Sequence, residues 1–353
     1  MRVGIITEQP EHNGSTYYRA AQYVPRFRAR GVSVELLAPT AVVDAHSGRV
    51  DRARYFARHA VGYARRAREL SHALHSFDAV LVQRGVYPMG PGLICGPLER
   101  FDGRIVLDLD DAVQDLSPLM STKGRASRWL YGSHQALRLL ERADAIVVST
   151  PALAETLGRP VAAIVPTIPD TARFPSVEHR TVLPIRLGWV GSRGGLGALD
   201  PLAGVIADLD AESVATLTVV CSEPWLGGVS NFRRWQRRDD PALFGEFDVG
   251  LMPLPDTPYA RTKAGFKLLQ HMAAGSPVIA SPVGINSWLV RESGAGLLAS
   301  TPPEWEAALR RLAADPEERR LMGDRGRAFM RDYADLDHQA DVLLELLRGP
   351  TGS

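Results

Sequence analysis

The stretch FDVGLMPLPDTPYARTKAGFKLLQHMAAGSPVIASPVGIN, residues 247–286, decides the fold of this chain. We expect an apolar strand at 249–252, a polar loop, a helix at 266–274 that Gly275 ends, and a second strand at 277–280. This order is typical of a parallel sheet, in which the loop and the helix N-terminus lie beyond the carboxyl ends of the strands. Free N–H groups and the helix dipole favour anions there, so the stretch predicts a site for a phosphate-bearing ligand.

The same alternation of strands and helices extends over the rest of the chain, and it favours parallel sheets with helical crossovers. Further strands are expected at 3–7, 32–37, 79–82, 105–107, 145–149, 185–190 and 217–221. Further helices are expected at 17–30, 125–142 and 339–347, with a long basic helix before the strand at 79–82. We therefore predict an α/β fold with two doubly wound, Rossmann-like domains that face a cleft.

The domain boundaries follow from composition. Four prolines between residues 164 and 184 interrupt the pattern, and we assign 166–184 to an interdomain linker. The N-terminal domain is then 1–165 and the C-terminal domain 185–335. The last segment, 336–353, holds an amphipathic helix that we expect to cross back onto the N-terminal domain, followed by a tail.

Composition argues against a nucleic-acid-binding protein, a cysteine-ligated metal site and a membrane-spanning protein. The chain has 353 residues, 45% hydrophobic and 23% charged, with a net charge of +1, so no global field argues for nucleic acid as a partner. Its two cysteines, Cys95 and Cys221, are far apart and have no metal-ligand spacing. No apolar run reaches the roughly 20 residues of a membrane span, and the N-terminus lacks a signal-peptide pattern. We expect a cytoplasmic protein; the oligomeric state stays open.

The motif GWVGSRGG, residues 188–195, follows the first expected strand of the second half. Glycines such as Gly191 let the backbone approach a diphosphate, beside Ser192, and Arg193 supplies positive charge. The spacing does not fit the dinucleotide fingerprint, and a flexible strand-to-helix turn is the alternative interpretation.

Two lysines flank the start of the expected helix at 266–274. Lys263 and Lys267 are two of only three lysines in a chain that otherwise uses arginine. Lysine is a compact point charge suited to phosphate oxygens. The alternative is a pair of solvated surface residues.

Acidic residues follow the strand expected at 105–107. Asp108 and Asp110 lie on the same side of an extended chain, with Asp111 beside them. Carboxylates at this edge can bind a metal, act as acid or base, or accept hydrogen bonds from hydroxyl groups. The alternative is a polar cap for the next helix, with Asp111 as its N-cap.

A glycine-bearing loop, His12 to Thr16, lies between the first strand and the first helix. Gly14 and Ser15 in it, with Arg19 on the following turn, are suited to contact a ligand in the cleft. The alternative is an ordinary turn with Ser15 or Thr16 as the helix N-cap.

The segment 51–75 is rich in arginine, and its six arginines are Arg52, Arg54, Arg58, Arg65, Arg66 and Arg68. Such a helix can contact an acidic acceptor or an anionic membrane surface, and the membrane contact would put the protein at the inner face of the membrane. A solvated helix face is the alternative.

With these motifs in place, the chain resembles the retaining glycosyltransferases of family 4, which have the GT-B fold. The segment GLMPLPDTPYARTKAGFKLLQHMAAGSPVIASPVGIN resembles the donor site of a branch with a Lys-x-x-x-Lys loop. YYRAAQYVPRFRARGVSVELL, VLVQRGVYP and VLDLDDA resemble the N-terminal domain of that branch. PTIPDTARF resembles the interdomain crossover, and GWVGS the start of the donor domain.

This resemblance implies a hexosyltransferase-type enzyme that transfers a sugar from a UDP- or GDP-linked donor with retention of anomeric configuration, without a metal or other cofactor. The expected catalytic residues are Lys267, Lys263, Arg193 and Asp110. The expected donor-binding residues are Gly191, Ser192, Thr262, Gly265, Phe266 and Gln270. The expected acceptor or cleft residues are Gly14, Ser15, Arg19 and Asp108. The main catalytic requirement is positive charge from the protein, placed beside the departing diphosphate.

The chain departs from the Glu-x7-Glu pattern of that family. Thr262 stands at the first glutamate and Gln270 at the second. An amide can still hydrogen-bond a ribose hydroxyl, whereas a threonine cannot replace a carboxylate that holds the donor sugar.

Two other functions compete with a glycosyltransferase: a GT-B-like sugar-nucleotide epimerase, and a non-catalytic subunit that binds a nucleotide sugar. The acceptor, whether small-molecule, lipid-linked or glycan, is not identified by the sequence. Polysaccharide assembly and natural-product biosynthesis both fit.

Overall fold

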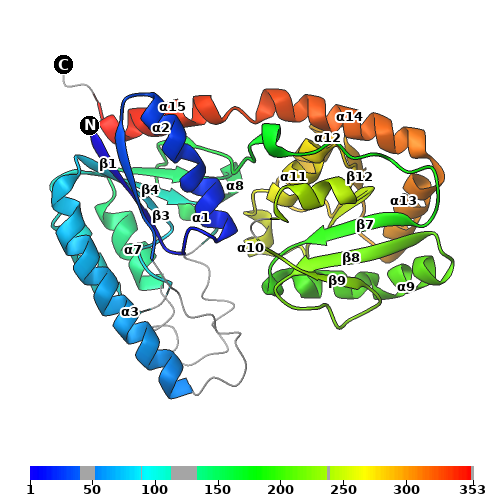
Figure 1. Cartoon of the computed structure of the whole chain (residues 1–353), viewed down its shortest axis with the longest axis horizontal. Helices are drawn as coiled ribbons and strands as arrows, with labels where there is room; N and C mark the ends of the chain where they lie inside the picture. The colour runs from blue at the N-terminus through cyan, green and yellow to red at the C-terminus, as the bar shows by residue number, and fades with distance from the viewer. Residues whose placement is uncertain (40–51, 89, 113–132, 237–238, 351–353) are drawn as a thin grey trace. The chain divides into compact units, whose positions relative to one another are not determined.

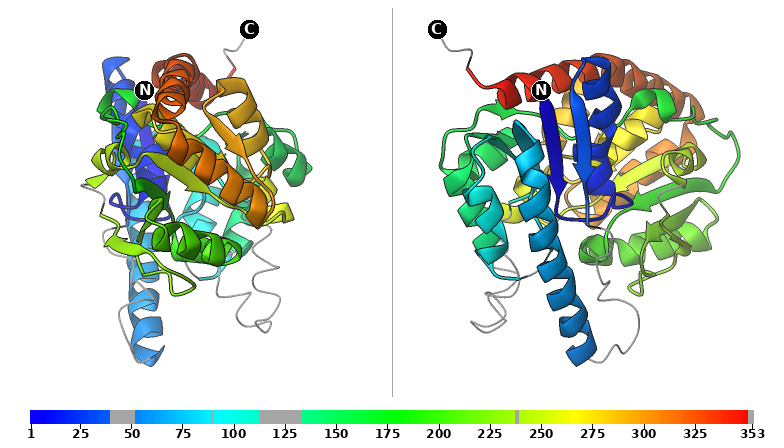
Figure 2. Two further views of the ribbon diagram at one scale, coloured as in Figure 1. Left: turned by 90° about the vertical axis from the view of Figure 1, so that its right-hand side faces the viewer. Right: turned by 60° about the vertical axis from the view of Figure 1, so that its left-hand side comes forward.

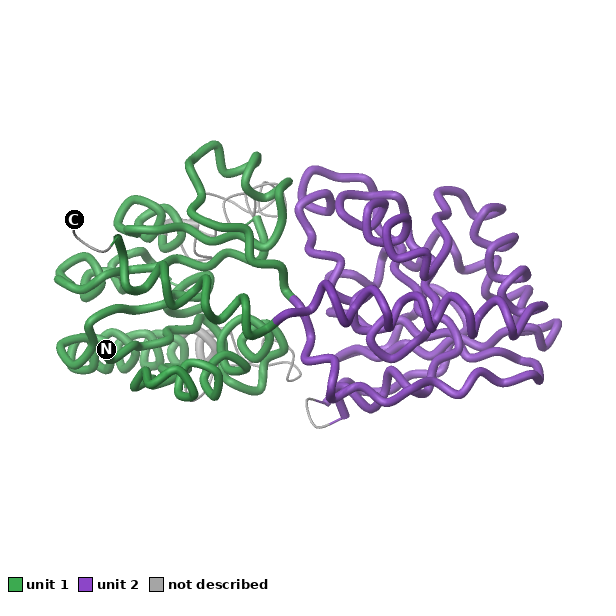
Figure 3. The backbone as a smooth tube through the Cα atoms, turned by 90° about the horizontal axis from the view of Figure 1, so that it is seen from above, with its two compact units in different colours: residues 1–167, 336–353 green, residues 168–335 purple. Residues whose placement is uncertain are grey.

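The computed structural model describes residues 1–39, 52–88, 90–112, 133–236 and 239–350 (Figure 1). It forms two compact units, each with a six-stranded, all-parallel sheet. Unit 1 comprises residues 1–167 and 336–353, and unit 2 comprises residues 168–335 (Figure 3). The predicted α/β class with two doubly wound, Rossmann-like domains is confirmed.

The sheet of unit 1 has the strand order β2-β1-β3-β4-β5-β6. Its strands are β1 (Arg2–Thr7), β2 (Ser33–Leu37), β3 (Ala79–Gln83), β4 (Arg104–Leu109), β5 (Ala145–Val148) and β6 (Ala163–Ile164). Its helices are α1 (Gly14–Arg19), η1 (Ala21–Tyr23), α2 (Val24–Ala29), α3 (Arg52–Ala73), η2 (Leu74–Ser76), η3 (Gly92–Cys95), α4 (Gly96–Glu99), α7 (Ser133–Arg142), α8 (Pro151–Leu157) and α15 (Leu336–Arg348). The central strands are buried on both faces, as expected of a parallel sheet with helical crossovers.

The sheet of unit 2 has the order β12-β11-β10-β7-β8-β9. Its strands are β7 (Ile185–Val190), β8 (Ala215–Cys221), β9 (Asn231–Arg234), β10 (Val249–Met252), β11 (Val278–Ala280) and β12 (Gly296–Leu298). Its helices are η5 (Thr171–Arg173), η6 (Arg193–Leu202), α9 (Ala203–Ala211), η8 (Ala242–Glu246), α10 (Pro258–Arg261), α11 (Phe266–Ala274), α12 (Asn286–Ser293), α13 (Pro302–Ala314) and α14 (Pro316–Tyr333). One core cluster under this sheet includes Trp189, Trp225 and Trp305.

The helix expected at 17–30 is broken into α1, η1 and α2. Pro25 lies in the first turn of α2, where a missing N–H costs nothing, and it separates α2 from the turn before it. The N-cap of α1 is Asn13, whose side chain accepts from the Ser15 N–H, so the alternative interpretation with Ser15 or Thr16 as the cap is wrong. Asp111 as the cap of a following helix falls at the border of 113–132, which lie outside the described residues.

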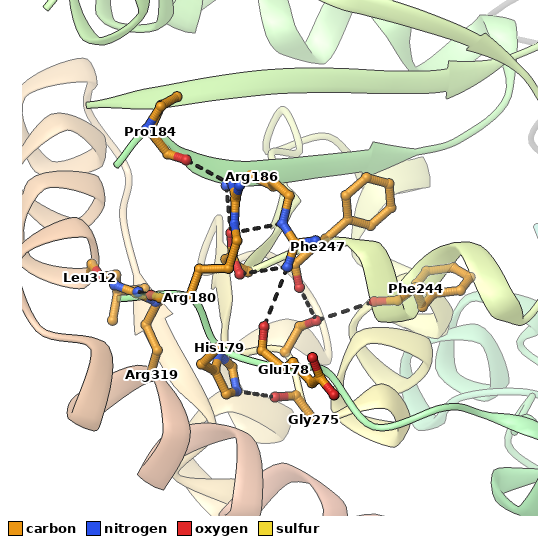
Figure 4. Close-up of polar contacts among 12 residues, drawn as sticks. Glu178, His179, Arg180, Pro184, Arg186, Phe244, Phe247, Gly275, Leu312 and Arg319 are labelled. Carbon is orange, nitrogen blue, oxygen red and sulfur yellow. Dashed lines mark hydrogen bonds and ion pairs between the residues drawn. The ribbon is translucent and has the colours of Figure 1, made fainter. Parts of the chain in front are cut away.

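The proline-rich segment expected as a linker belongs to unit 2 from residue 168 onwards. Figure 4 shows polar contacts of its residues Glu178, His179, Arg180 and Pro184. The Val177 N–H donates to the Ala274 carbonyl at 2.9 Å, and His179 Nε2 donates to the Gly275 carbonyl at 3.0 Å. Arg180 donates to the Pro184 carbonyl at 2.8 Å. One backbone N–H and two side chains therefore hold this segment in a fixed course.

The C-terminal helix α15 belongs to unit 1, where it contacts α2, β3 and β4. The Tyr23 hydroxyl donates to Gln339 Oε1 at 2.6 Å, and Gln339 Nε2 donates to the Pro166 carbonyl at 3.1 Å. Leu343, Leu344 and Leu347 are buried. Unit 1 is thus completed by a segment that follows unit 2 in the chain.

The basic helix α3 covers 22 residues, and its N-terminal part extends away from the sheet of unit 1 (Figure 2). Its C-terminal part is anchored, with Leu70 fully buried.

Candidate functional site

The loop before α11 has a short helix of its own. After β10, the Thr257 side chain caps α10, accepting from the Ala260 N–H at 3.1 Å. Gly265 follows at φ +64°, and a β-carbon there would lie 2.5 Å from Leu289 Cδ1. Only glycine meets both the left-handed backbone and the close approach at this position. The loop therefore enters α11 with its free N–H groups at the carboxyl edge of the sheet.

Lys267 lies on the first turn of α11 and is half-buried. Its ammonium donates to Gln270 Oε1 at 2.8 Å and lies 5.4 Å from the centre of the Phe266 ring and 5.9 Å from that of Phe244. Burial lowers the pKa of Lys267, and the nearby charge of Asp240 works against that effect. The ammonium is held on one side by an amide and two aromatic faces.

Lys263 precedes α11 and is more loosely held. Its ammonium lies 4.7 Å from the centre of the Tyr259 ring, on the turn before it. The two lysines thus flank the loop through Gly265, one at a fixed position and one on a flexible stem.

Thr262 and Gln270, the two departures from the glutamate pattern, are both buried. The Thr262 hydroxyl donates to the Tyr259 carbonyl at 2.9 Å, so it bonds to its own short helix. Gln270 lies between two charged groups: it accepts from Lys267, and its Nε2 donates to Asp240 Oδ1 at 3.2 Å. Asp240 was not anticipated, because nothing in the local pattern of its loop distinguishes it from a solvated residue.

The glycine motif leaves β7, the strand that pairs with β10. A β-carbon at Gly191 would lie 2.4 Å from the Trp189 ring, so this glycine is required by packing. Ser192 is exposed, and Arg193 forms an ion pair of 3.2 Å with Glu223. Since β7 and β10 are parallel neighbours, this motif and the lysine loop leave the same edge of the sheet.

In unit 1, the structure brings Ser15 and Asp110 together. Ser15 Oγ donates to Asp110 Oδ2 and accepts from Gln83 Nε2 at 2.9 Å. Arg84 Nε lies 3.4 Å from Asp110 Oδ1 and 3.6 Å from Glu8 Oε2. Burial raises the pKa of Glu8, and Arg84 offsets only part of that shift.

These groups lie where β1, β3 and β4 end, and Gly14 is on the adjoining helix α1 with open space where a β-carbon would lie. Arg84 has φ +64°, an uncommon conformation for a non-glycine residue and a feature often found at functional sites. Gln83 and Arg84 were not anticipated, although a polar pair directly after an expected strand was the available signal.

Arg19 and Asp108 have a structural environment instead of a ligand-facing one. They are 2% and 1% exposed, and Arg19 donates to both carboxylate oxygens. Arg19 also donates to the Val165 carbonyl and to the Thr167 hydroxyl. Burial alone would lower the pKa of Arg19, but the charge and hydrogen bonds of Asp108 raise it, so the guanidinium stays protonated. Burial raises the pKa of Asp108, and the charge and hydrogen bonds of Arg19 oppose that shift. The pair joins α1, β4 and the segment after β6.

One member of the arginine-rich helix is also buried. Arg66 is 1% exposed and donates to the carbonyls of Thr7, Leu37 and Val86, all at or beyond strand ends. It therefore stabilises the sheet edge and is unavailable to a membrane. Arg58, Arg65 and Arg68 are exposed, whereas the side chains of Arg52 and Arg54 lie outside the described residues.

Within the part of the chain that the structure describes, no helix is long and apolar enough to cross a bilayer. The described residues also hold no group of three or more His, Cys, Asp or Glu arranged for a metal ion. Cys95 and Cys221 are buried free thiols.

Comparisons with known proteins agree with this architecture. Residues 205–345 match the model of a family described as glycosyl transferase-like. Among solved structures, sucrose-phosphate synthase from Thermosynechococcus elongatus has a TM-score of 0.71 at 17% identity, with 99% of this chain and 98% of that chain covered.

Two further structures are similar over their full length. WaaG, a glycosyltransferase involved in lipopolysaccharide biosynthesis, has a TM-score of 0.61 at 18% identity, covering 99% of this chain and 100% of that one. HepE from Anabaena, in complex with UDP, has a TM-score of 0.61 at 13% identity, with the same coverage. A search of curated proteins finds no significant sequence match. Residues 205–345 therefore resemble glycosyl transferases, and the two six-stranded parallel sheets have the GT-B fold of these solved structures.

Proposed function

We propose that the protein is a retaining glycosyltransferase of family 4 that uses a nucleoside diphosphate sugar. The observation that carries this proposal is the half-buried Lys267 on the first turn of α11, behind the left-handed Gly265. A fixed ammonium beside free helix N–H groups suits the diphosphate of a donor. HepE, whose fold is similar, is in complex with UDP, which supports a uridine or related nucleotide.

Catalysis then requires positive charge beside the leaving diphosphate. As the glycosidic bond breaks, negative charge grows on the departing diphosphate oxygen. Lys267 supplies a cation from the first turn of α11, Lys263 one from the loop before that helix, and Arg193 one from the segment after β7. The exposed Ser192 and the backbone around Gly191 and Gly265 contribute N–H donors to the phosphates.

We propose that transfer proceeds on one face of the sugar, with retention and without a metal ion. In this route the leaving diphosphate accepts the acceptor's proton, so the protein need supply no nucleophile. The three cations named above take the place that a metal would have in neutralising the diphosphate. Phe266 and Gln270 are the proposed neighbours of the nucleoside.

The acceptor is proposed to bind unit 1 at the ends of β1, β3 and β4. There Asp110 and Ser15 form one hydrogen-bonded group beside Gly14. Carboxylate and hydroxyl oxygens at this edge suit an acceptor rich in hydroxyl groups. Asp110 is proposed to position the reacting sugar or the acceptor hydroxyl.

Calorimetry with UDP, GDP, UDP-glucose and GDP-mannose tests the donor, followed by measurement of donor hydrolysis. We expect one nucleotide to bind and its sugar ester to be hydrolysed slowly with release of the nucleoside diphosphate. Absence of binding to every nucleotide would overturn the proposal. The anomeric configuration of the released sugar, measured by NMR at early times, tests retention.

Peripheral membrane contact is proposed through the exposed arginines Arg58, Arg65 and Arg68 of α3. Binding to vesicles of anionic phospholipid should be strong at low salt and weaken as salt screens the charges. The triple replacement of these arginines by glutamine should abolish it. Equal binding by the variant, or none by the wild type at low salt, would dismiss this contact.

A further inference from the structure

Asp240 is a buried carboxylate that the proposed donor site does not use directly. It is 2% exposed and lies in the loop before η8. Its Oδ1 accepts from Gln270 Nε2 at 3.2 Å, and Gln270 Oε1 accepts from the Lys267 ammonium at 2.8 Å. A carboxylate, an amide and an ammonium thus form a continuous chain of hydrogen bonds.

The chemistry of the amide gives this chain a direction. An ionised carboxylate only accepts hydrogen bonds, so Asp240 requires the NH2 end of the Gln270 amide. The carbonyl end is thereby turned towards Lys267, which only donates. Gln270 is 0% exposed, so water does not compete for either end. Without the carboxylate, the amide could rotate and present its NH2 group to the ammonium.

The surroundings of Lys267 make this orientation consequential. The rings of Phe266 and Phe244 flank its ammonium, and His271 lies one helical turn on. Burial lowers the pKa of His271 to about 3, with a smaller contribution from Lys267, so this histidine is neutral and supplies no charge. Asp240 is the one charged group that acts on Lys267 among the described residues, and it opposes the effect of burial on the lysine pKa.

We propose that Asp240 is a positioning residue, which orients the Gln270 amide and thereby fixes the Lys267 ammonium against the leaving diphosphate. This role rests on the proposed function for its diphosphate, but the hydrogen-bonded chain exists in the free protein. Asp240 does not touch the donor in this scheme. One ammonium hydrogen is bound by Gln270, and the others are left to point at phosphate oxygens.

The protein has only three lysines, so the titration of each lysine can be followed directly. In protein labelled with [13C]lysine, the 13Cε signals report each ammonium separately, and Lys263→Arg and Lys267→Arg assign them. Removing the carboxylate in Asp240→Asn should lower the pKa of Lys267, because the charge that opposes burial is lost. The Lys263 signal should titrate as before, which provides an internal control. Asp239→Asn, next in sequence, is the matched control and should leave Lys267 unchanged.

Activity supplies the second readout. Asp240→Asn should reduce turnover of the donor roughly a hundredfold, as expected when a catalytic group is misplaced by about an ångström. The alkaline limb of its pH–rate profile should move to lower pH with the lysine pKa. If Asp240→Asn fails to fold, Gln270→Met breaks the same chain and should also alter the Lys267 titration.

Three outcomes distinguish a failure of the positioning role of Asp240 from a failure of the proposed function. An unchanged Lys267 titration in folded Asp240→Asn or Gln270→Met would overturn the positioning role. A full loss of activity with an unchanged Lys267 titration would likewise overturn it, since Asp240 would then act by another route. If wild-type protein binds no UDP or GDP while Lys267 still responds to Asp240→Asn, the proposed function fails and the hydrogen-bonded chain stands.

Discussion

At the scale of single residues, burial gives Arg19 and Asp108 a structural role, as an ion pair inside unit 1, in place of the ligand contact expected from the sequence. Removing one partner leaves the other charge buried without a counter-charge, which costs about 3–5 kcal/mol. We therefore expect Arg19→Met and Asp108→Asn each to lower the free energy of unfolding by that amount, as measured by urea denaturation. The double variant Arg19→Met/Asp108→Leu should be more stable than either single variant, because it buries no charge.

The control for this prediction is Arg138→Ala. Arg138 pairs with Glu99 at 2.5 Å, but both side chains are about one-third exposed. A pair in contact with water contributes little to stability, so this variant should unfold at the wild-type urea concentration. If Arg19→Met behaved like the control and lost only activity, Arg19 would be a ligand contact after all.

Lys267 carries the second prediction at this scale. Lys267→Ala removes the fixed ammonium, and we expect donor turnover to fall by two orders of magnitude, equivalent to about 3 kcal/mol of transition-state stabilisation. The protein should still fold, since Lys267 contributes one hydrogen bond and two ring contacts. Circular dichroism checks the fold, and initial rates with the donor found by calorimetry check the activity.

Arg261→Ala is the matched control in the same loop. Arg261 is 60% exposed and its guanidinium is paired with Asp256 at 2.6 Å. Its loss should leave turnover within a factor of about two. Near-normal turnover by folded Lys267→Ala would remove Lys267 from the mechanism.

At the scale of elements, the loop into α11 depends on the backbone of Gly265. Alanine there must adopt φ +64° and bring its β-carbon against Leu289 and Ile285. The left-handed conformation alone costs an L-residue about 1–2 kcal/mol, and the close contacts add to it. Gly265→Ala should therefore lower the free energy of unfolding and weaken nucleotide binding together, as measured by urea denaturation and calorimetry.

Gly194→Ala is the comparison in the glycine motif. Nothing lies within 4 Å of a β-carbon at Gly194, and its φ is not in the left-handed region. The free energy of unfolding of Gly194→Ala should equal that of the wild type. Weaker nucleotide binding without a loss of stability would mean that the backbone at Gly194 approaches the phosphates. Equal stability of Gly265→Ala and wild type would contradict the packing argument.

Sequence predicts best the elements whose ends are marked by residue chemistry. β10 and α11 lie where their apolar patterns and the stop at Gly275 place them. The helix expected at 17–30 fails because its apolar period runs through Pro25, although the backbone restarts there. Asp240, Gln83 and Arg84 were missed because their roles come from partners distant in sequence. A pattern along one segment cannot show which carboxylate will be buried against an amide on another.

At the scale of the whole molecule, unit 1 is assembled from two parts of the chain. Its sheet and most of its helices come from residues 1–167, and α15 comes from beyond unit 2. Unit 2 has a separate core beneath its own sheet, formed by residues 185–322. The last helix of unit 1, α15, therefore follows unit 2 in the sequence. We infer that the stability of unit 1 depends on this helix.

Deleting residues 336–353 should consequently destabilise unit 1 and spare unit 2. The deletion removes four buried leucines, each contributing about 1.5–3 kcal/mol, and the two hydrogen bonds of Gln339. That sum is comparable to the total stability of a typical domain, about 5–15 kcal/mol. Hydrogen exchange with mass spectrometry should show rapid exchange in β1 and β3 while β10 and α11 keep their protection. Deleting only 351–353 is the control and should change neither unit. Full protection of β1 and β3 without α15 would show that unit 1 folds from residues 1–167 alone, and equal loss in β10 would show that the two units unfold as one.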